Sequence, residues 1–104
     1  MTTDPSDTSS RDRDTLDLHR RQIDRIDLTI LALLRERVRL GLSLGAIKRA
    51  IDLPIRAPVR EAEVLTRVCE AASAPLSRDG VERIFTAIIE ETAASQERDD
   101  DAAR

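Results

Sequence analysis

The segment from about Thr15 to Ile51 carries an apolar repeat with helical spacing. Its apolar residues recur with gaps of seven, or of three and four, at Ile23, Ile26, Ile30, Leu33, Leu40, Leu44, Ile47 and Ile51. The spacing predicts one amphipathic helix of about 36 residues, which would be about 54 Å long. A compact domain of this size has a radius of gyration of only about 13 Å. The rest of the chain is too short to cover the whole seam, so we expect a second identical chain to do so.

Two shorter helices should follow this long one. Pro54 and Pro58 in "DLPIRAP" end the first helix, and Pro58 suits the first turn of a second helix that stops before "SAP" at 73–75. Ser77 can cap a third helix that runs to about Gln96. With a single aromatic residue and few glycines, the composition favours an all-α fold of three helices.

The two ends of the chain are strongly polar. Residues 1–14 have no apolar side chain after Met1, which predicts a disordered N-terminal arm, and residues 97–104 resemble a solvated tail. The helical domain is therefore expected at 15–96. The formal net charge of −3 argues against a nucleic-acid partner, and no run is apolar enough for a membrane span. A polar N-terminus without a visible signal peptide and a lone Cys69 lead us to expect a cytoplasmic protein.

Charged residues interrupt the apolar seam. Arg37 stands where the repeat calls for an apolar residue, and Lys48, three turns later, falls within about 20° of it. A buried cation is costly unless it is paired. Either the two side chains reach water along the helix surface, or they meet a negatively charged partner. Gly41 and Gly45, between them, are either tolerated or allow another backbone to approach closely.

The other two helices add polar groups. Ile88, Thr92 and Gln96 follow each other at intervals of four on one face of the third helix, where a polar end could also reflect fraying. Arg60 and Glu61 lie in the first turn of the second helix, where Glu61 suits the helix dipole without any further role.

Together these residues form a set of cations, one carboxylate, one hydroxyl and one amide. The sequence has no nucleophile–base pair and no phosphate-binding glycine loop, and His19 has no ligand spacing for a metal. Such a set is suited to binding a small dianion and to catalysis by fixed charges and donors. No cofactor and no metal is implied.

The same residues resemble a known family. The stretches "LHRRQIDRIDLTILALLRERVRLGLSLGAIKRA", "LPIRAPVREAEVL" and "VERIFTAIIEETAASQ" are similar to the all-helical class of chorismate mutases, the type II superfamily. The resemblance covers Leu18 to Gln96. It implies an intertwined dimer in which the long first helices pack together, and an isomerase that converts chorismate to prephenate in the shikimate pathway to aromatic amino acids.

Roles for individual residues follow from this resemblance. Arg37 would hold a substrate carboxylate in its own chain's site, while Arg20 would reach the site of the other subunit. Lys48 would bind a carboxylate and the ether oxygen of the breaking bond, and Gln96 would donate to that same oxygen. Thr92 stands where the family commonly has a serine near a carboxylate.

The ring end of the site departs from the family pattern. The resemblance places Arg60 and Glu61 beside the ring, with Glu61 accepting from the C4 hydroxyl. Ala57 stands where the family often has an aspartate, which leaves only a backbone N–H as donor there. Relatives that act on 4-amino-4-deoxychorismate, or that split isochorismate into salicylate and pyruvate, are therefore alternatives. The retained Glu61 favours the mutase.

An alternative of another class is a non-catalytic helical dimerisation module. In such a module the aligned cations would pair with Asp or Glu side chains across the dimer.

Overall fold

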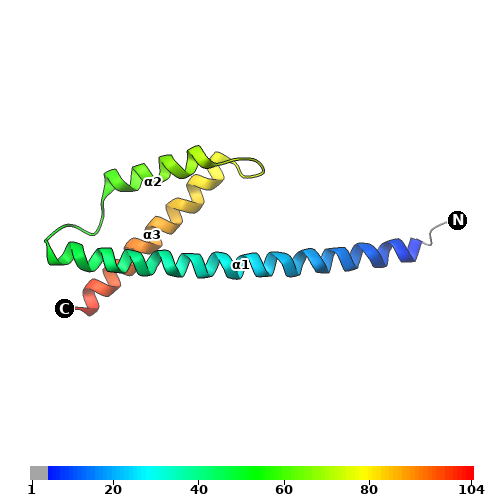
Figure 1. The fold of residues 1–104 in the computed structure, drawn as a ribbon, viewed down its shortest axis with the longest axis horizontal. Helices are drawn as coiled ribbons and strands as arrows, with labels where there is room; N and C mark the ends of the chain where they lie inside the picture. Colours follow the sequence, from blue (N-terminus) through cyan, green and yellow to red (C-terminus); the bar gives the residue numbers. More distant parts are fainter. Residues whose placement is uncertain (1–4) are drawn as a thin grey trace. The chain divides into compact units, whose positions relative to one another are not determined.

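The computed structural model describes the chain from Pro5 to Arg104, and these residues form three helices. They are α1 (Pro5–Ala50), α2 (Pro58–Ala71) and α3 (Arg78–Ala102), as Figure 1 shows. No strand occurs among the described residues, which confirms the expected all-α class. The chain divides into two units, one that ends at Leu33 and one that spans Leu34–Arg104. The second unit contains the C-terminal part of α1 together with α2 and α3.

Two helices extend further than expected. The prediction of a disordered N-terminal arm is wrong from Pro5 onward, because α1 begins at that residue. Met1–Asp4 lie outside the described residues. A helix that is already nucleated can continue without apolar contacts, since each added residue contributes one hydrogen bond. At the other end α3 continues through the predicted tail to Ala102, where Asp100 binds Arg49 at 3.3 Å. The division into domains remains a prediction.

The break after α1 has a specific backbone geometry. Asp52 has a positive φ of 58°, the Leu53 N–H donates to the Lys48 carbonyl at 2.8 Å, and the Asp52 N–H donates to the Arg49 carbonyl at 3.4 Å. This pair of bonds is the Schellman motif, in which a left-handed residue ends the helix. Pro54 follows and prevents the helix from resuming, so the predicted break is confirmed.

The predicted starts of α2 and α3 are also confirmed. Pro58 occupies the first turn of α2, and the Ser77 side chain accepts a hydrogen bond from the Gly80 N–H at 3.0 Å. The two helices pack against each other. Their buried apolar residues are Cys69, Val81, Ile89 and Ala93, so the sole cysteine belongs to the core.

Gly41 and Gly45 of α1 are the points where α3 approaches most closely. A Cβ atom on Gly41 would lie 2.5 Å from Thr92 Cγ2, and one on Gly45 would lie 3.2 Å from Gln96 Cγ. An alanine at position 41 would therefore overlap Thr92. The close approach expected from the two glycines occurs, and the neighbour is α3 of the same chain.

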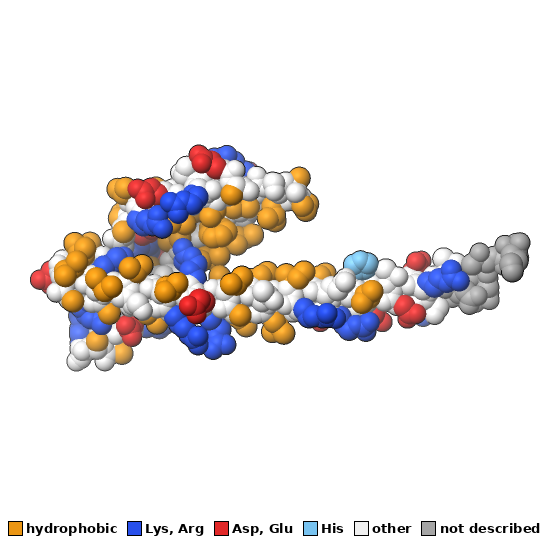
Figure 2. All heavy atoms as spheres, in the orientation of Figure 1, with side chains coloured by type: hydrophobic (Ala, Val, Ile, Leu, Met, Phe, Trp, Pro, Cys, Tyr) orange, Lys and Arg blue, Asp and Glu red, His pale blue; other side chains and the backbone are white. Residues whose placement is uncertain are grey.

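The apolar seam of α1 remains uncovered in the single chain. In the second unit Leu40, Leu44, Ile47 and Ile51 are between 55% and 61% exposed, and in the first unit the seam residues Ile23, Ile26, Ile30 and Leu33 are exposed as well. Figure 2 shows these apolar side chains along the surface of α1. Arg37 and Lys48 lie beside this seam, as expected, on the adjacent face that also carries Gly41 and Gly45. In the part of the chain that the structure describes, no helix has an apolar stretch long enough to cross a bilayer.

Candidate active site

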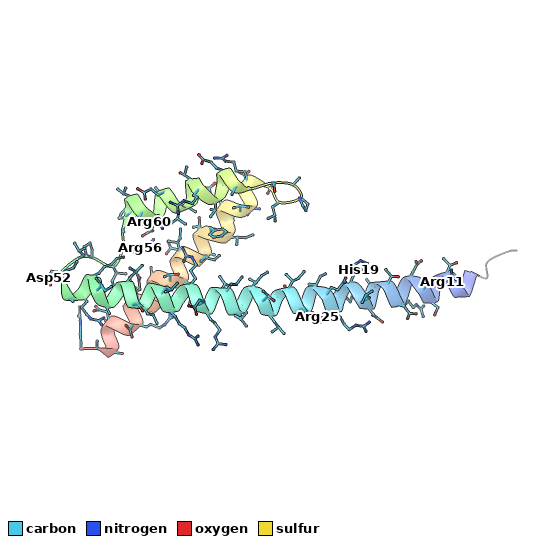
Figure 3. All side chains as sticks on the ribbon, viewed as in Figure 1. Arg11, His19, Arg25, Asp52, Arg56 and Arg60 are labelled. Atoms are coloured by element: carbon cyan, nitrogen blue, oxygen red, sulfur yellow. The ribbon has the colours of Figure 1, made fainter. Side chains whose placement is uncertain are left out.

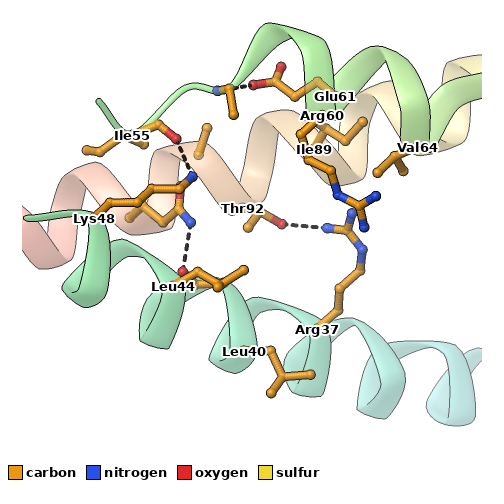
Figure 4. A pocket seen from close by; sticks show the side chains of 14 residues that line it. Arg37, Leu40, Leu44, Lys48, Ile55, Arg60, Glu61, Val64, Ile89 and Thr92 are labelled. Atoms are coloured by element: carbon orange, nitrogen blue, oxygen red, sulfur yellow. Dashed lines mark hydrogen bonds between the residues drawn. The ribbon is translucent and has the colours of Figure 1, made fainter. Parts of the chain in front are cut away.

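A cavity of about 240 Å³ lies within the second unit, where the C-terminal part of α1, the start of α2 and the middle of α3 meet. Figure 4 shows it from close by. Its lining comprises Arg37, Leu40, Gly41, Leu44, Lys48, Ile55, Ala57, Arg60, Glu61, Val64, Ile89, Thr92, Ala93 and Gln96. The apolar side chains among them provide walls with a low dielectric constant, in which charged and polar groups interact more strongly than in water.

One side of the cavity is formed by α1 and α3. The Nη1 of Arg37 donates to the Thr92 hydroxyl at 2.9 Å, and that hydroxyl donates in turn to the Ile88 carbonyl at 2.9 Å. The hydroxyl proton is committed to the helix backbone, so the Thr92 oxygen faces Arg37 as an acceptor. This contact orients the guanidinium toward the cavity without neutralising its charge.

Lys48 and Gln96 are each held by a backbone carbonyl. The Lys48 ammonium donates to the Ile55 carbonyl at 2.8 Å, and the Gln96 amide nitrogen donates to the Gly41 carbonyl at 2.7 Å. Gln96 is buried, with 7% of its surface exposed. An ammonium has three N–H bonds and a primary amide has two, so both side chains retain donors for a ligand.

The opposite side of the cavity comes from α2. In Figure 4 the guanidinium of Arg60 projects from α2 toward that of Arg37, which projects from α1. Arg60 also lies 3.6 Å from Glu63, an exposed pair within the first turns of α2. Two cations that face each other repel, and an anion between them would relieve that repulsion.

Glu61 is the carboxylate of this side. Its Oε2 accepts a hydrogen bond from the Ala57 backbone N–H at 3.2 Å, so the N–H that the sequence analysis left for the substrate is already bound. Its carboxylate also accepts from the Arg56 guanidinium, with a distance of 3.0 Å from Nε to Oε2. This hydrogen bond, ahead of the contribution from Ala57, holds the pKa of Glu61 below its ordinary value. The carboxylate is therefore ionised at neutral pH.

Arg56 is a contributor that the sequence analysis missed. It binds Glu61 and also Glu90 of α3, and these bonds raise its own pKa. Arg56 lies just before the acidic first turn of α2, which was a usable signal for Glu61. Glu90 follows 34 residues later, and only the packing of α3 brings it there.

The structure brings together seven of the eight predicted site residues, which are Arg37, Lys48, Ala57, Arg60, Glu61, Thr92 and Gln96. Arg20 is an exposed residue of the first unit, and its role in a second subunit's site remains a prediction. His19 is exposed and donates to the Thr15 carbonyl at 2.8 Å, as expected for a surface residue. Among the described residues no group of His, Cys, Asp and Glu side chains is arranged to hold a metal ion.

Solved structures of similar fold come from two bacteria. A chorismate mutase of Thermus thermophilus superposes with a TM-score of 0.79 at 28% identity, over 81% of this chain and 96% of that one. A chorismate mutase of Helicobacter pylori, solved in complex with prephenate, superposes with a TM-score of 0.77 at 27% identity, over 83% of this chain and 93% of that one.

The sequence comparisons agree. A segment of 49 residues, 47% of this chain, is 47% identical to the bifunctional chorismate mutase/prephenate dehydratase of Aquifex aeolicus (strain VF5). The match spans only 14% of the length of that protein. The family model described as chorismate mutase type II matches residues 19–97, which include each predicted site residue. The chain therefore belongs to the chorismate mutase type II family.

Proposed function

We propose that this protein is a chorismate mutase, an isomerase that converts chorismate to prephenate by a Claisen rearrangement. The observation that carries the proposal is the pair of guanidiniums of Arg37 and Arg60, which face each other in the cavity, together with Lys48 at the opposite end (Figure 4). Three cations around one small apolar cavity provide a binding site for a dicarboxylate. The Helicobacter pylori relative was solved with prephenate, which fits this class of ligand.

The proposed reaction breaks one C–O bond and forms one C–C bond within a single molecule. Arg37 and Lys48 would hold carboxylates, so that the enolpyruvyl arm lies over the ring in a reactive conformation. Spare N–H bonds of Lys48 and Gln96 would meet the negative charge that develops on the ether oxygen. Because these donors are already fixed by the Gly41 and Ile55 carbonyls, little reorganisation is needed in the transition state.

The C4 substituent distinguishes the mutase from its relatives. Glu61 is ionised and faces the cavity, where it can accept a hydrogen bond from a C4 hydroxyl. Its partners Arg56 and Ala57 already use acceptor positions on both oxygens, so fewer remain for the three N–H bonds of a C4 ammonium. This arrangement favours a hydroxyl over an amino group at C4.

The direct test is an assay with three substrates in parallel. The purified protein is mixed separately with chorismate, isochorismate and 4-amino-4-deoxychorismate, and the loss of absorbance and the products are followed. We expect loss of chorismate with formation of prephenate. Release of pyruvate and salicylate from isochorismate would instead identify a lyase, and consumption of only the amino analogue would identify the amino-mutase.

A non-catalytic dimerisation module is the alternative from another class. It would use Arg37 and Lys48 as partners for carboxylates. In the described part of the chain both side chains donate instead to uncharged oxygens, the Thr92 hydroxyl and the Ile55 carbonyl. That choice of partners leaves the two cations available to a ligand, which supports the enzyme.

The proposal includes a homodimer in which Arg20 completes the site of the other subunit. Its support is the apolar seam, whose residues in both units are exposed in the single chain. Arg20 also lies about 100° from the Arg37 face of a regular helix, so the two side chains diverge. The test uses Arg20→Ala and Arg37→Ala, each inactive as a homodimer. When both are unfolded together and refolded, about half of the dimers should be mixed, and about a quarter of all sites should regain both arginines.

One variant is labelled with nitrogen-15, so that native mass spectrometry can distinguish mixed dimers from the two homodimers. If proven mixed dimers have no more activity than the separate variants, Arg20 serves its own chain's site or none, and the shared site is wrong. A cooperatively folded monomer in sedimentation equilibrium at low micromolar concentration would contradict the dimer itself.

A further inference from the structure

Arg56 lies in the connection between α1 and α2, close to the start of α2 (Figure 3), and it is not one of the residues that line the cavity. Its guanidinium binds two carboxylates that come from different helices. It donates to both oxygens of Glu61 on α2, and it donates to both oxygens of Glu90 on α3 at 3.1 and 2.9 Å. Such two-point bonds fix the orientation of a carboxylate as well as its position.

Glu61 lies among cations that the proposed reaction needs. Lys48 is near enough to contribute to the lowered pKa of Glu61, and Arg60 is its neighbour in sequence. The largest contribution, however, is the hydrogen bond from Arg56. The negative charge of Glu61 is thus balanced mainly by Arg56, which does not line the cavity, rather than by the cations that do.

We infer that Arg56 is a positioning residue that holds Glu61 at the ring end of the cavity and keeps Lys48 and Arg60 available for the substrate carboxylates. The inference rests on the proposed function for its substrate. Without Arg56, the ionised Glu61 would be free to pair with Lys48, and a dianionic substrate would then have to displace it. The positioning residue therefore acts through Glu61 and does not itself contact the substrate.

The second partner explains why an arginine is suited to this place. Glu90 is on α3, and its bonds hold the guanidinium of Arg56, which is not part of the cavity lining. A planar guanidinium offers five donors in fixed directions, enough for two carboxylates at once, whereas a lysine offers a single point charge. Arg56→Lys should therefore neutralise Glu61 only in part.

An alternative role for Arg56 is that of a tether between α2 and α3. A tether would stabilise the helix packing whatever side chain stood at position 61. Neutralisation of Glu61 requires the carboxylate, and this difference makes the two roles separable by experiment.

The test begins with Arg56→Gln in the full chain. We expect its KM for chorismate to rise about tenfold while kcat changes less than about threefold, because a charge-assisted bond is replaced and Glu61 competes for Lys48. Arg56→Lys should fall between this variant and the wild type. Should Arg56→Gln fail to fold, Glu90→Gln keeps both Arg56 and Glu61, and we expect a KM increase of about two- to threefold, with unchanged KM counting against the proposal.

The decisive measurement repeats Arg56→Gln in the Glu61→Gln background. There we expect the KM to change less than about twofold, since no carboxylate remains to compete for the cations. An equal increase of KM in both backgrounds would identify Arg56 as a tether and overturn the proposal. Arg49→Gln is the matched control, because it breaks a different ion pair to α3, that between Arg49 and Asp100 outside the cavity lining, and its KM should stay that of the wild type.

A measurement without substrate separates this inference from the proposed function. Carbon-13 NMR of the Glu61 carboxyl should show a higher pKa in Arg56→Gln than in the wild type, because pairing with the Lys48 ammonium replaces only part of the two-point contact with Arg56. If the wild type consumes no chorismate, the proposed function fails while this titration still reports on the contact. If the pKa of Glu61 is the same in both proteins, the role of Arg56 is wrong even when the wild type is active.

Discussion

The two sides of the cavity hold their charges in different ways. The α1–α3 wall is defined by Arg37, Lys48, Thr92 and Gln96. Its cations and its amide donate hydrogen bonds to a hydroxyl and to backbone carbonyls. On the α2 wall, formed by Ala57, Arg60 and Glu61, the carboxylate is bound by an arginine from outside the lining. The first wall leaves its positive charge uncompensated, and the second has its negative charge neutralised.

The difference matters because an incoming ligand must replace the hydrogen bonds that the charged side chains already make. A hydrogen bond from a cation to a neutral oxygen lacks the Coulomb attraction between opposite charges that an ion pair adds. A substrate carboxylate can therefore displace the neutral oxygen bound to Arg37 or Lys48 at modest cost. It could not easily separate Arg56 from Glu61. The cations Arg37 and Lys48, which would bind the substrate carboxylates, therefore stay available in the cavity. The carboxylate of Glu61, which would repel the substrate, is bound by an arginine that is not part of the cavity lining.

Substitution of the uncompensated cations should have the largest effect. We expect Arg37→Lys and Lys48→Ala each to lower kcat/KM for chorismate by about 10²–10³-fold, since each removes donors aimed at a carboxylate or at the developing charge. Circular dichroism should report an unchanged helix content. Arg39→Lys, at an exposed position two residues further along α1, is the matched control and should remain fully active. Near wild-type turnover by Arg37→Lys would remove the distinction between the two walls.

The pH dependence tests the amide of the α1–α3 wall. The wild type should show a flat profile between about pH 6 and 8, because the predicted site has no group that titrates there and the pKa of Glu61 is lowered. In Gln96→Glu the new carboxyl can donate only when protonated, and its oxygen would lie near the Gly41 carbonyl, which also disfavours the ionised form. Above the pKa of this carboxyl we expect kcat to rise about tenfold for each unit of decrease in pH. A profile as flat as that of the wild type would exclude Gln96 from the role at the ether oxygen.

The close approach of α3 to α1 at Gly41 can be tested by measuring the free energy of unfolding alone. Alanine in place of Gly41 gains about 1 kcal/mol of helix propensity, but its Cβ would lie 2.5 Å from Thr92 Cγ2, and overpacking costs about 1–3 kcal/mol. The contact lies between two helices that hydrogen bond across it, so we expect the cost to prevail and Gly41→Ala to lose about 1–2 kcal/mol in urea unfolding.

A second substitution identifies the cause of that loss. Thr92→Ser removes Cγ2 while it keeps the hydroxyl that accepts from Arg37, so Gly41→Ala combined with Thr92→Ser should recover the stability of Thr92→Ser alone or exceed it. If Gly41→Ala is as stable as the wild type, α3 does not approach α1 as closely as the structure has it.

The features that the sequence predicted are those that depend on neighbouring residues. The end of α1 near Pro54, the start of α2 at Pro58 and the cap of α3 at Ser77 were all confirmed. Arg37 and Lys48 were found because a helix of regular period places them on one face. Each of these features is set within a few turns of chain, and the seven cavity residues were identified with the help of the family resemblance.

Packing between distant residues decided the rest. The sequence showed an apolar seam on α1, yet α3 lies against the adjacent face, where two glycines leave room for Thr92 and Gln96. Glu90 lies 34 residues from Arg56, and the Ala57 N–H binds Glu61 instead of staying available to a ligand. The sequence by itself determined the three helices and their polar faces, because helix periodicity, proline and capping act locally. The tertiary structure decided which face of each helix packs against its neighbour and which charged side chains are neutralised. Both depend on distances that only the packed helices define.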